Sequence, residues 1–159
     1  FYADYDLDAQ SPAPHATAAQ AFALFTRAAS PARAVQAAMA LERLVRSGGL
    51  MVTSRQSGQQ WDAPNGWAPL QWVAIEGLRA YGHEALAATI ANRWLAMVER
   101  IHRDSGLLLE KYDVEHFKGG SGGEYPLEIG FGWTNGVTLA LIAAASGPQP
   151  CIRQSRPQS

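Results

Sequence analysis

The sequence predicts an all-α protein made of helical hairpins that are joined by two long loops. Apolar residues recur at the three- and four-residue spacing of a helix face in several segments, and short links connect these segments in pairs. Two other links, residues 48–67 and 106–133, are long and irregular. Because unstructured segments of more than about 12–15 residues in a compact domain commonly carry binding or catalytic groups, we expect the chemistry to lie in these two loops.

The first hairpin is predicted to start with an alanine-rich helix over residues 16–29, since alanine has the highest helix propensity. Ser30 followed by Pro31 is typical of the cap and first turn of a second helix, which the glycine pair at 48–49 should end. The apolar face of this second helix is expected to consist of Val35, Met39, Leu41, Leu44 and Val45.

The second hairpin begins with a helix that Pro69 opens and Gly82 ends. Gly77 lies on its apolar face and would allow a neighbouring helix to approach closely. The partner helix, residues 84–103, has the clearest helical pattern of the sequence. Its apolar face comprises Leu86, Ile90, Trp94, Met97, Val98 and Ile101.

A last helix is predicted over residues 135–145, with Thr134 as its cap. It is apolar nearly all round, which is typical of a helix in the interior of a protein. The chain is short enough for one domain, which we assign to residues 1–145. Residues 146–159 are rich in proline, glutamine, serine and arginine, so we expect a flexible tail there.

Charge and composition argue against several classes of partner. A net charge of -1 and a pI near 6.5 provide no basic patch for nucleic acid or for a membrane surface. Cys151 is the only cysteine, so neither an intrachain disulfide nor a cysteine zinc cluster can form. A metal enzyme is disfavoured, because the histidines lack the spacing of paired ligands on one helix face. These histidines are His15, His83, His102 and His116.

The compartment is left open by the sequence. No apolar run approaches the ~20 residues that a membrane-spanning helix needs, and the first residues lack the pattern of a signal peptide. If the protein is exported, we expect its signal upstream of Phe1. The expected location is then the periplasm for an exported bacterial protein and the cytoplasm otherwise.

The first long loop carries two tryptophans around a turn. Trp61 and Trp67 flank the segment Pro64-Asn65-Gly66, and their flat faces with one donor each are suited to stacking on sugar rings. The alternative is that both indoles simply fill the core at the entrance of a helix. For a pair of tryptophans around a turn, the two interpretations have similar weight.

The second long loop combines carboxylates with glycines. The glycine-rich run at 119–123 is not followed by a Lys-Ser/Thr pair, and Glu124 would repel an anion, so a phosphate site is disfavoured. A neutral polyol fits better. Glycoside hydrolysis commonly needs two carboxyl groups, and Glu110 and Glu124 are the leading pair on the residues alone. The alternative is that either one caps a turn or pairs with a nearby lysine.

Three motifs carry a resemblance to a known family. QWDAPNGWAP at residues 60–69, GGEY at 122–125 and GFGWTNGV at 130–137 resemble signatures of the trehalases, a family of glycoside hydrolases. The resemblance is strong over residues 60–142 and weaker over residues 1–59. Ser121 departs from the family's pattern, in which the corresponding run is usually all glycine.

The resemblance implies a fold, a reaction and a set of site residues. It implies part of an (α/α)6 barrel that hydrolyses α,α-trehalose to two glucose molecules with inversion and without metal or cofactor. It also implies that Glu110 is the general base and that Glu124 binds substrate hydroxyls instead of transferring the proton. The implied substrate-binding residues are Glu124, Trp61, Asn65, Trp133 and Asn135.

The implied general acid does not occur in this sequence. In the family it is an aspartate in a Gly-Trp-Asp segment far upstream, whereas Asp62 belongs to a different motif and is not assigned that role. We therefore expect residues 1–159 to be the C-terminal part of a barrel whose remainder comes from an upstream segment. We further expect this portion alone not to turn over trehalose, since proton donation to the leaving oxygen contributes about 10²–10⁴-fold.

Two other functions remain open at this point. The first is a non-catalytic helical module that binds carbohydrate or serves as a scaffold, which would need the tryptophans but not an ionised Glu110. The second is another glucosidase on the same paired-helix barrel with a different disaccharide as substrate.

Overall fold

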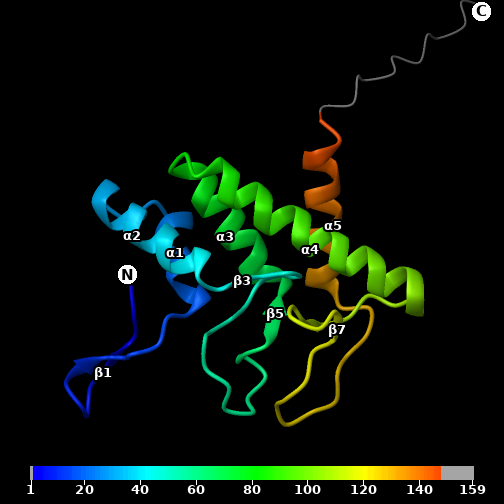
Figure 1. The fold of residues 1–159 in the computed structure, drawn as a ribbon, viewed down its shortest axis with the longest axis horizontal. Coiled ribbons are helices and arrows are strands. Elements are labelled where there is room, and N and C mark those ends of the chain that lie inside the picture. The colour runs from blue at the N-terminus through cyan, green and yellow to red at the C-terminus, as the bar shows by residue number, and fades with distance from the viewer. Residues whose placement is uncertain (1, 148–159) are drawn as a thin grey trace, which may run out of the picture.

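The computed structural model describes residues 2–147 (Figure 1). The helices are the 3-10 helix η1 Ala18–Gln20 and the α-helices α1 Ala21–Phe25, α2 Pro31–Glu42, α3 Ala68–Ala80, α4 Glu84–Ser105 and α5 Gly132–Ala145. The strands are β1 Tyr5–Asp6, β2 Ser11–Pro12, β3 Val45–Arg46, β4 Gly49–Leu50, β5 Asn65–Trp67, β6 Lys111–Asp113 and β7 Lys118–Gly119. The predicted all-α class is confirmed. Of the predicted tail, residues 148–159 lie outside the described part.

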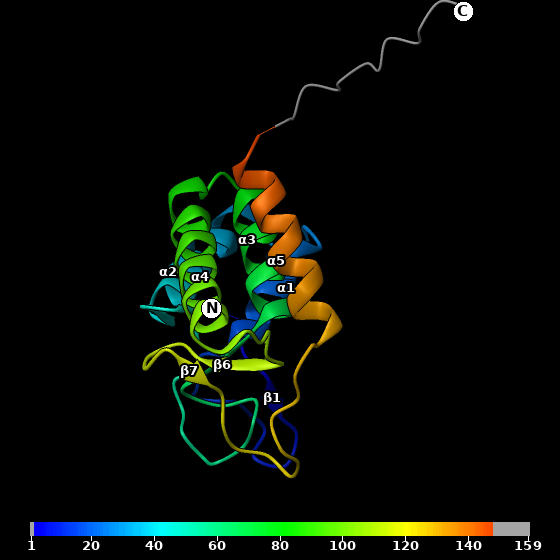
Figure 2. The ribbon, with the colours of Figure 1, turned by 90° about the vertical axis from the view of Figure 1, so that its right-hand side faces the viewer.

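The helices pack side by side, and the long loops extend from one end of them (Figures 1 and 2). α3 lies centrally and contacts α1, α4 and α5. The sheet of β5, β6 and β7 lies at the end where α3 begins and α4 ends, together with both long loops. The architecture therefore brings the two loops singled out from the sequence to the same end of the helices.

The first hairpin is shorter than predicted, because the backbone turns within both expected helices. The helix expected over residues 16–29 consists of η1 and α1 and ends at Phe25. Arg27 follows with a φ of 58°, which no right-handed helix contains. α2 ends at Glu42, and the chain then forms the β3–β4 hairpin, in which Gly49 has a φ of 121°.

The predicted apolar face of the second helix is wrong in part: Leu41 and Leu44 are buried as expected, but the other three residues are not. Val35 and Met39 are 51% and 54% exposed, and Val45 belongs to a strand. α2 instead contacts α1 and η1 through small side chains, which allow close approach of the helices. Its buried residues are Ala34, Ala37, Ala38, Ala40 and Leu41.

The second hairpin agrees with the prediction to within two residues at each end of α3 and α4. α4 buries most of the predicted face and ends at Gly106, a left-handed cap with a φ of 73°. Gly77 lies where α3 crosses α1: a Cβ atom there would be 2.8 Å from the Phe25 nitrogen and 2.9 Å from the Leu24 Cβ. The close contact of α1 with α3 therefore requires glycine at this position.

α5 starts earlier than predicted and is less buried. Its cap position is Phe131, and Thr134 lies in the first turn, where its hydroxyl donates a hydrogen bond of 2.7 Å to the Leu109 carbonyl oxygen. One side of α5 contacts α3 and α4. Beside this contact, Leu139 is 68% exposed and Ile142 is 48% exposed, and both line an open pocket between α5 and α4. The expectation of an interior helix is thus not met within residues 2–147.

A small antiparallel sheet joins the two long loops. β6 pairs with β5 on one side and with β7 on the other. The register places Trp67 opposite Lys111 and Asn65 opposite Asp113. Leu109 forms an isolated bridge to Ile129 within the second long loop. The pairing of β5 with β6 connects the loop before α3 to the loop before α5.

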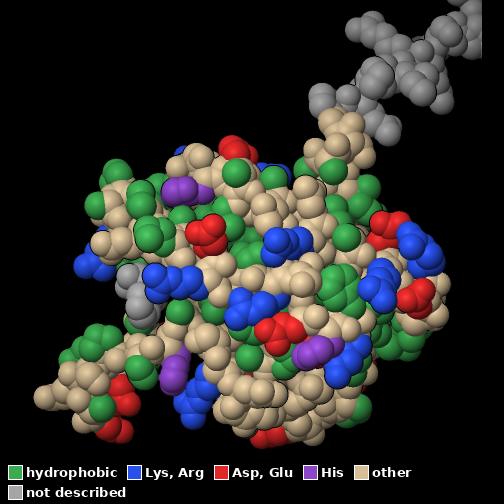
Figure 3. Space-filling view, in the orientation of Figure 1, with side chains coloured by type: hydrophobic (Ala, Val, Ile, Leu, Met, Phe, Trp, Pro, Cys, Tyr) green, Lys and Arg blue, Asp and Glu red, His purple; other side chains and the backbone are tan. Residues whose placement is uncertain are grey.

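The surface over α2 and α4 carries acidic and basic side chains intermixed, without one sign prevailing on the face shown in Figure 3. Among the described residues, no helix is long and apolar enough to cross a bilayer.

Asp62 fixes the conformation of the first long loop. Its buried carboxylate accepts hydrogen bonds from the backbone nitrogens of Ser57 and Ala63. Burial raises the pKa of Asp62, but the hydrogen bonds from Ser57, Ala63 and Gly58 lower it by more, so the pKa lies below the usual 3.8. Asp62 therefore acts as an ionised anchor of this loop.

We predict that Gly77→Ala destabilises the protein. The added methyl would collide with the backbone of α1, and we expect overpacking to cost about 1–3 kcal/mol, outweighing the gain in helix propensity. Gly136→Ala in α5 is the matched control: among the described residues, no neighbouring atom would lie within 4 Å of the added methyl, so a gain of up to about 1 kcal/mol is expected. The free energy of unfolding in urea measures both. Equal effects of the two changes would contradict the close contact at Gly77.

We predict that Asp62→Asn lowers stability at neutral pH and that its effect fades in acid. Because the folded-state pKa of Asp62 is depressed, its contribution is present above the unfolded value near 3.8 and is lost as pH falls through the folded value. Unfolding measured between pH 7 and pH 2 should show the difference from the parent protein shrinking below about pH 4. Asp104→Asn, at an exposed position of α4, should show no such trend. A difference that is constant with pH would refute the ionised anchor.

Candidate active site

Glu110 lies at the junction of the second long loop with β6. Its backbone nitrogen donates to the Glu128 carbonyl oxygen at 3.0 Å, and its own carbonyl oxygen accepts from the Trp133 indole at 3.3 Å. The side chain is buried. One carboxylate oxygen, Oε1, accepts a hydrogen bond of 2.9 Å from the Tyr125 hydroxyl. The other, Oε2, is buried and has no hydrogen-bond partner among the described residues.

A pocket of about 340 Å³ lies beside Tyr125, the donor to this carboxylate, while Glu110 itself is not among its lining residues. It is lined by residues of both long loops, namely Gln59, Gln60, Trp61, Gly123, Glu124 and Tyr125. Tyr125 links the pocket to Glu110, because its side chain lines the pocket and its hydroxyl donates a hydrogen bond to the Glu110 carboxylate. Trp61 and Glu124, both predicted to bind substrate, thus face the same space.

The Tyr125 phenol is held in its donor form. Its hydrogen bond to the carboxylate of Glu110 raises the pKa of Tyr125, and burial and the charge of Glu128 raise it further, against a smaller opposite effect of Gln60. A protonated phenol can only donate to the carboxylate, so the hydrogen bond fixes the orientation of the Glu110 side chain.

The tryptophans form one aromatic cluster. Trp61 stacks on Trp67 with ring centroids 4.0 Å apart and an interplanar angle of 5°. Trp133 meets both edge-on, at 6.4 Å from Trp61 and 5.5 Å from Trp67. Trp67 is fully buried, whereas Trp61 is 45% exposed. The two interpretations of the pair therefore each apply to one member: Trp67 fills the core, and Trp61 offers a surface toward the pocket.

Asn65 is committed to the protein itself. Its amide nitrogen donates to the carbonyl oxygens of Gln60 at 3.0 Å and Ser121 at 2.5 Å, and its amide oxygen accepts from the Ser121 nitrogen at 3.1 Å. The side chain is 1% exposed. Both of its donor hydrogens are thus engaged in joining the two loops, and its predicted contact with substrate stays a prediction.

Asn135 is separated from the other predicted substrate-binding residues. It lines a mostly apolar pocket of about 490 Å³ between α4 and α5, together with side chains such as Val98 and Leu139. Trp133, two residues earlier, lies beside Glu110 and Trp61 instead. The prediction for Asn135 therefore rests on the motif and not on its position in the described chain.

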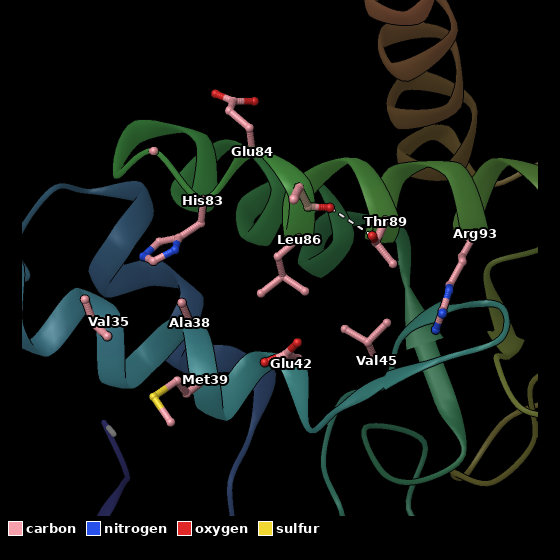
Figure 4. Close-up of a pocket in the computed structure, with 12 residues that line it drawn as sticks. Val35, Ala38, Met39, Glu42, Val45, His83, Glu84, Leu86, Thr89 and Arg93 are labelled. Carbon is pink, nitrogen blue, oxygen red and sulfur yellow. Dashed lines mark hydrogen bonds between the residues drawn. The ribbon is translucent and has the colours of Figure 1, made fainter.

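Another pocket lies away from these residues. It measures about 570 Å³ and opens between α2 and α4, where Val35 and Met39 face Leu86 across the space (Figure 4). No residue predicted to be catalytic or to bind substrate lines it. Within the described residues no group of three or more acidic, histidine or cysteine side chains could hold a metal ion.

Three further residues of the site were not singled out from the sequence. Tyr125 holds Glu110, Lys111 lies buried next to it, and Gln60 accepts a hydrogen bond from the Lys111 ammonium at 3.0 Å. Each directly adjoins a predicted site residue in the sequence, which was the available signal. Their roles depend on contacts between loops, which spacing along the chain does not reveal.

The sequence model of the trehalase family matches residues 1–146. The chain is 55% identical over 144 residues to a periplasmic trehalase of Pseudomonas aeruginosa, covering 89% of this chain and 26% of that one. It is 49% identical over 164 residues to a periplasmic trehalase of Salmonella schwarzengrund, covering 100% and 29%. The chain thus spans about a quarter of the length of the curated relatives it matches.

Solved structures agree with the sequence comparisons. The neutral trehalase of Saccharomyces cerevisiae superposes with a TM-score of 0.75 at 32% identity, covering 89% of this chain and 26% of that one. A GH63 mannosylglycerate hydrolase from Thermus thermophilus, solved with glucose, superposes with a TM-score of 0.67 at 31% identity, covering 89% and 34%. These enzymes are (α/α)6 barrels, so the helical pairs described here are part of such a barrel. On the match over residues 1–146, the chain belongs to the trehalase family.

Proposed function

We propose that this chain carries the general base of an inverting hydrolase of α,α-trehalose, and that Glu110 is this base. The observation that carries the proposal is the state of its carboxylate. One oxygen is fixed by Tyr125, the other has no partner among the described residues, and Tyr125 itself lines the pocket that contains Trp61 and Glu124. A base needs a free lone pair at a fixed position beside the substrate.

In the proposed reaction, Oε2 of Glu110 takes a proton from a water molecule. The water oxygen forms a bond to the anomeric carbon while the glycosidic bond breaks, and the leaving oxygen receives a proton from a carboxylic acid on the opposite face. By the family motif, that acid lies outside residues 1–159. The products are two glucose molecules, one of which has an inverted anomeric centre.

The pocket supplies contacts of the kind that sugars need. The exposed part of Trp61 would pack on a glucose ring, and the carboxylate of Glu124 would accept hydrogen bonds from its hydroxyls. The 55% identity to a periplasmic trehalase supports trehalose as the substrate and the periplasm as the compartment.

The remainder of the barrel is proposed to come from the rest of the same protein. The chain spans about a quarter of its curated relatives, and α5 exposes Leu139 and Ile142 along the open pocket that it forms with α4. A further helix packed there would bury this apolar surface and would close the ring of helices around the pocket.

A second candidate is a hydrolase for another glucoside or mannoside. It is favoured by the likeness to the GH63 mannosylglycerate hydrolase, although the identity of 31% is lower than that to the trehalases. Sugar release from trehalose, maltose, sucrose and mannosylglycerate, measured side by side with the complete protein, separates the candidates. Release from mannosylglycerate in preference to trehalose would favour the second. Binding without release from any of the four would indicate a non-catalytic module.

We predict that Glu110→Gln in the complete protein lowers kcat by about 10²–10⁴-fold, because the amide cannot accept the proton of the water. Trehalose affinity, measured by calorimetry, should change little, since the amide has nearly the same shape. Glu115→Gln is the matched control, because this side chain lies in the same loop, is 38% exposed and pairs with Arg46. Unchanged kcat in Glu110→Gln would remove Glu110 from the mechanism.

We predict that Trp61→Ala weakens trehalose binding by about tenfold, which corresponds to the upper part of the 0.5–1.5 kcal/mol range for one aromatic contact. Trp61→Phe should retain most of the affinity, because a ring can still pack on the sugar. KM and calorimetric affinity are the measurements. If alanine and phenylalanine reduce affinity equally, ring stacking is not the contribution of Trp61.

A further inference from the structure

Lys111 is a buried cation beside the proposed base. It belongs to β6, and its side chain is 1% exposed. Its ammonium donates to the Gln60 side-chain oxygen at 3.0 Å and to the Gly122 carbonyl oxygen at 3.4 Å. The ammonium also lies 5.4 Å from the ring centre of Trp67 and 5.0 Å from that of Tyr125. One lysine thus contacts both long loops.

The same ammonium lies 3.7 Å from Oε2 of Glu110, the oxygen without a hydrogen-bond partner among the described residues. This distance is too long for a hydrogen bond but short enough for strong attraction between opposite charges in a buried place. A lone carboxylate or ammonium buried there would be costly, so each charge depends on the other. Lys111 therefore balances the charge of Oε2 without occupying its lone pairs in a hydrogen bond.

We propose that Lys111 is a positioning residue for Glu110. Its charge balances the buried carboxylate, and its hydrogen bonds hold the loops that carry Trp61 and Glu124 at fixed places around it. This inference rests on the proposed function, since it assigns Lys111 a role in presenting the base to water. Lys111 itself does not exchange a proton with the substrate in this scheme.

The packing of the glycine-rich loop supports this assignment. A Cβ atom on Gly120 would lie 2.8 Å from the Lys111 Cγ and 2.8 Å from the Asn65 amide oxygen. The loop therefore lies directly on the lysine stem and on the side chain that joins the two loops. Glycine at this position serves the enclosure of the lysine, which is a different use from the cradling of a phosphate.

The first experiment measures the pairing without relying on activity. In the complete protein, Lys111→Met, Glu110→Gln and the double variant form a double-mutant cycle of thermal stability. Methionine keeps the length of the stem and removes the charge. If the charges pair, Lys111→Met should lower Tm roughly twice as much in the parent as in the Glu110→Gln background, because only the parent retains an orphaned carboxylate. An equal loss in both backgrounds, including failure of both variants to fold, would overturn the proposal.

The second experiment measures the consequence for the reaction. Lys111→Met should lower kcat on trehalose by about 100-fold, as expected when a catalytic group is misplaced, while KM changes by less than about threefold. Lys118→Met is the matched control, because this lysine lies in the same loop but is 66% exposed. The kcat of this variant should equal that of the parent protein. A rise in KM with unchanged kcat would overturn the positioning role.

The two experiments also separate this inference from the function on which it rests. If the parent protein releases no sugar, the proposed function fails, and the stability cycle still decides whether Lys111 and Glu110 are paired. If the parent is active but Lys111→Met retains full kcat, the function stands and the role of Lys111 does not.

Discussion

The pairing of β5 with β6 is the constraint on which the site depends. It connects the two long loops by pairing residues that are more than forty positions apart in the sequence, and its register sets Trp67 opposite Lys111. β5 leads directly into α3, and Glu110 immediately precedes β6. The pairing therefore brings Glu110 to the aromatic cluster, where its carbonyl oxygen accepts a hydrogen bond from the Trp133 indole. A shift by one residue would turn Lys111 to the other face of the sheet and leave Glu110 without its cation.

The buried polar groups around this pairing form one connected set. Asn65 joins Gln60 to Ser121, Lys111 joins Gln60 to Gly122, and Tyr125 closes over Glu110. Such groups stabilise a fold only when their hydrogen-bonding capacity is met, and nearly all of this capacity is met within the two loops. The exception in this set is Oε2 of Glu110, which has no hydrogen-bond partner among the described residues. This is the atom proposed to take the proton from water.

Much of the helical architecture could be predicted, whereas the sheet could not. α3 and α4 follow from periodicity because large apolar residues mark their buried faces. α2 misled the same reasoning, since it buries alanines and exposes Val35 and Met39. Strands of two or three residues are too short to produce an alternating pattern. The pocket around Trp61 and Glu124 lies in the loops that their length had indicated. The roles of Tyr125 and Lys111 depend on contacts across the fold that one-dimensional spacing does not encode.

The stacked indoles also give the molecule an internal optical reporter. Trp61 is partly exposed, Trp67 is buried, and the two rings are 4.0 Å apart and nearly parallel. Rings this close can exchange excitation, and the Lys111 ammonium places a charge 5.4 Å from the Trp67 ring. A sugar that covers Trp61, or an opening of the loop that separates the rings, would therefore change the intrinsic fluorescence. Movement at the pocket can thus be followed in real time without attaching a dye.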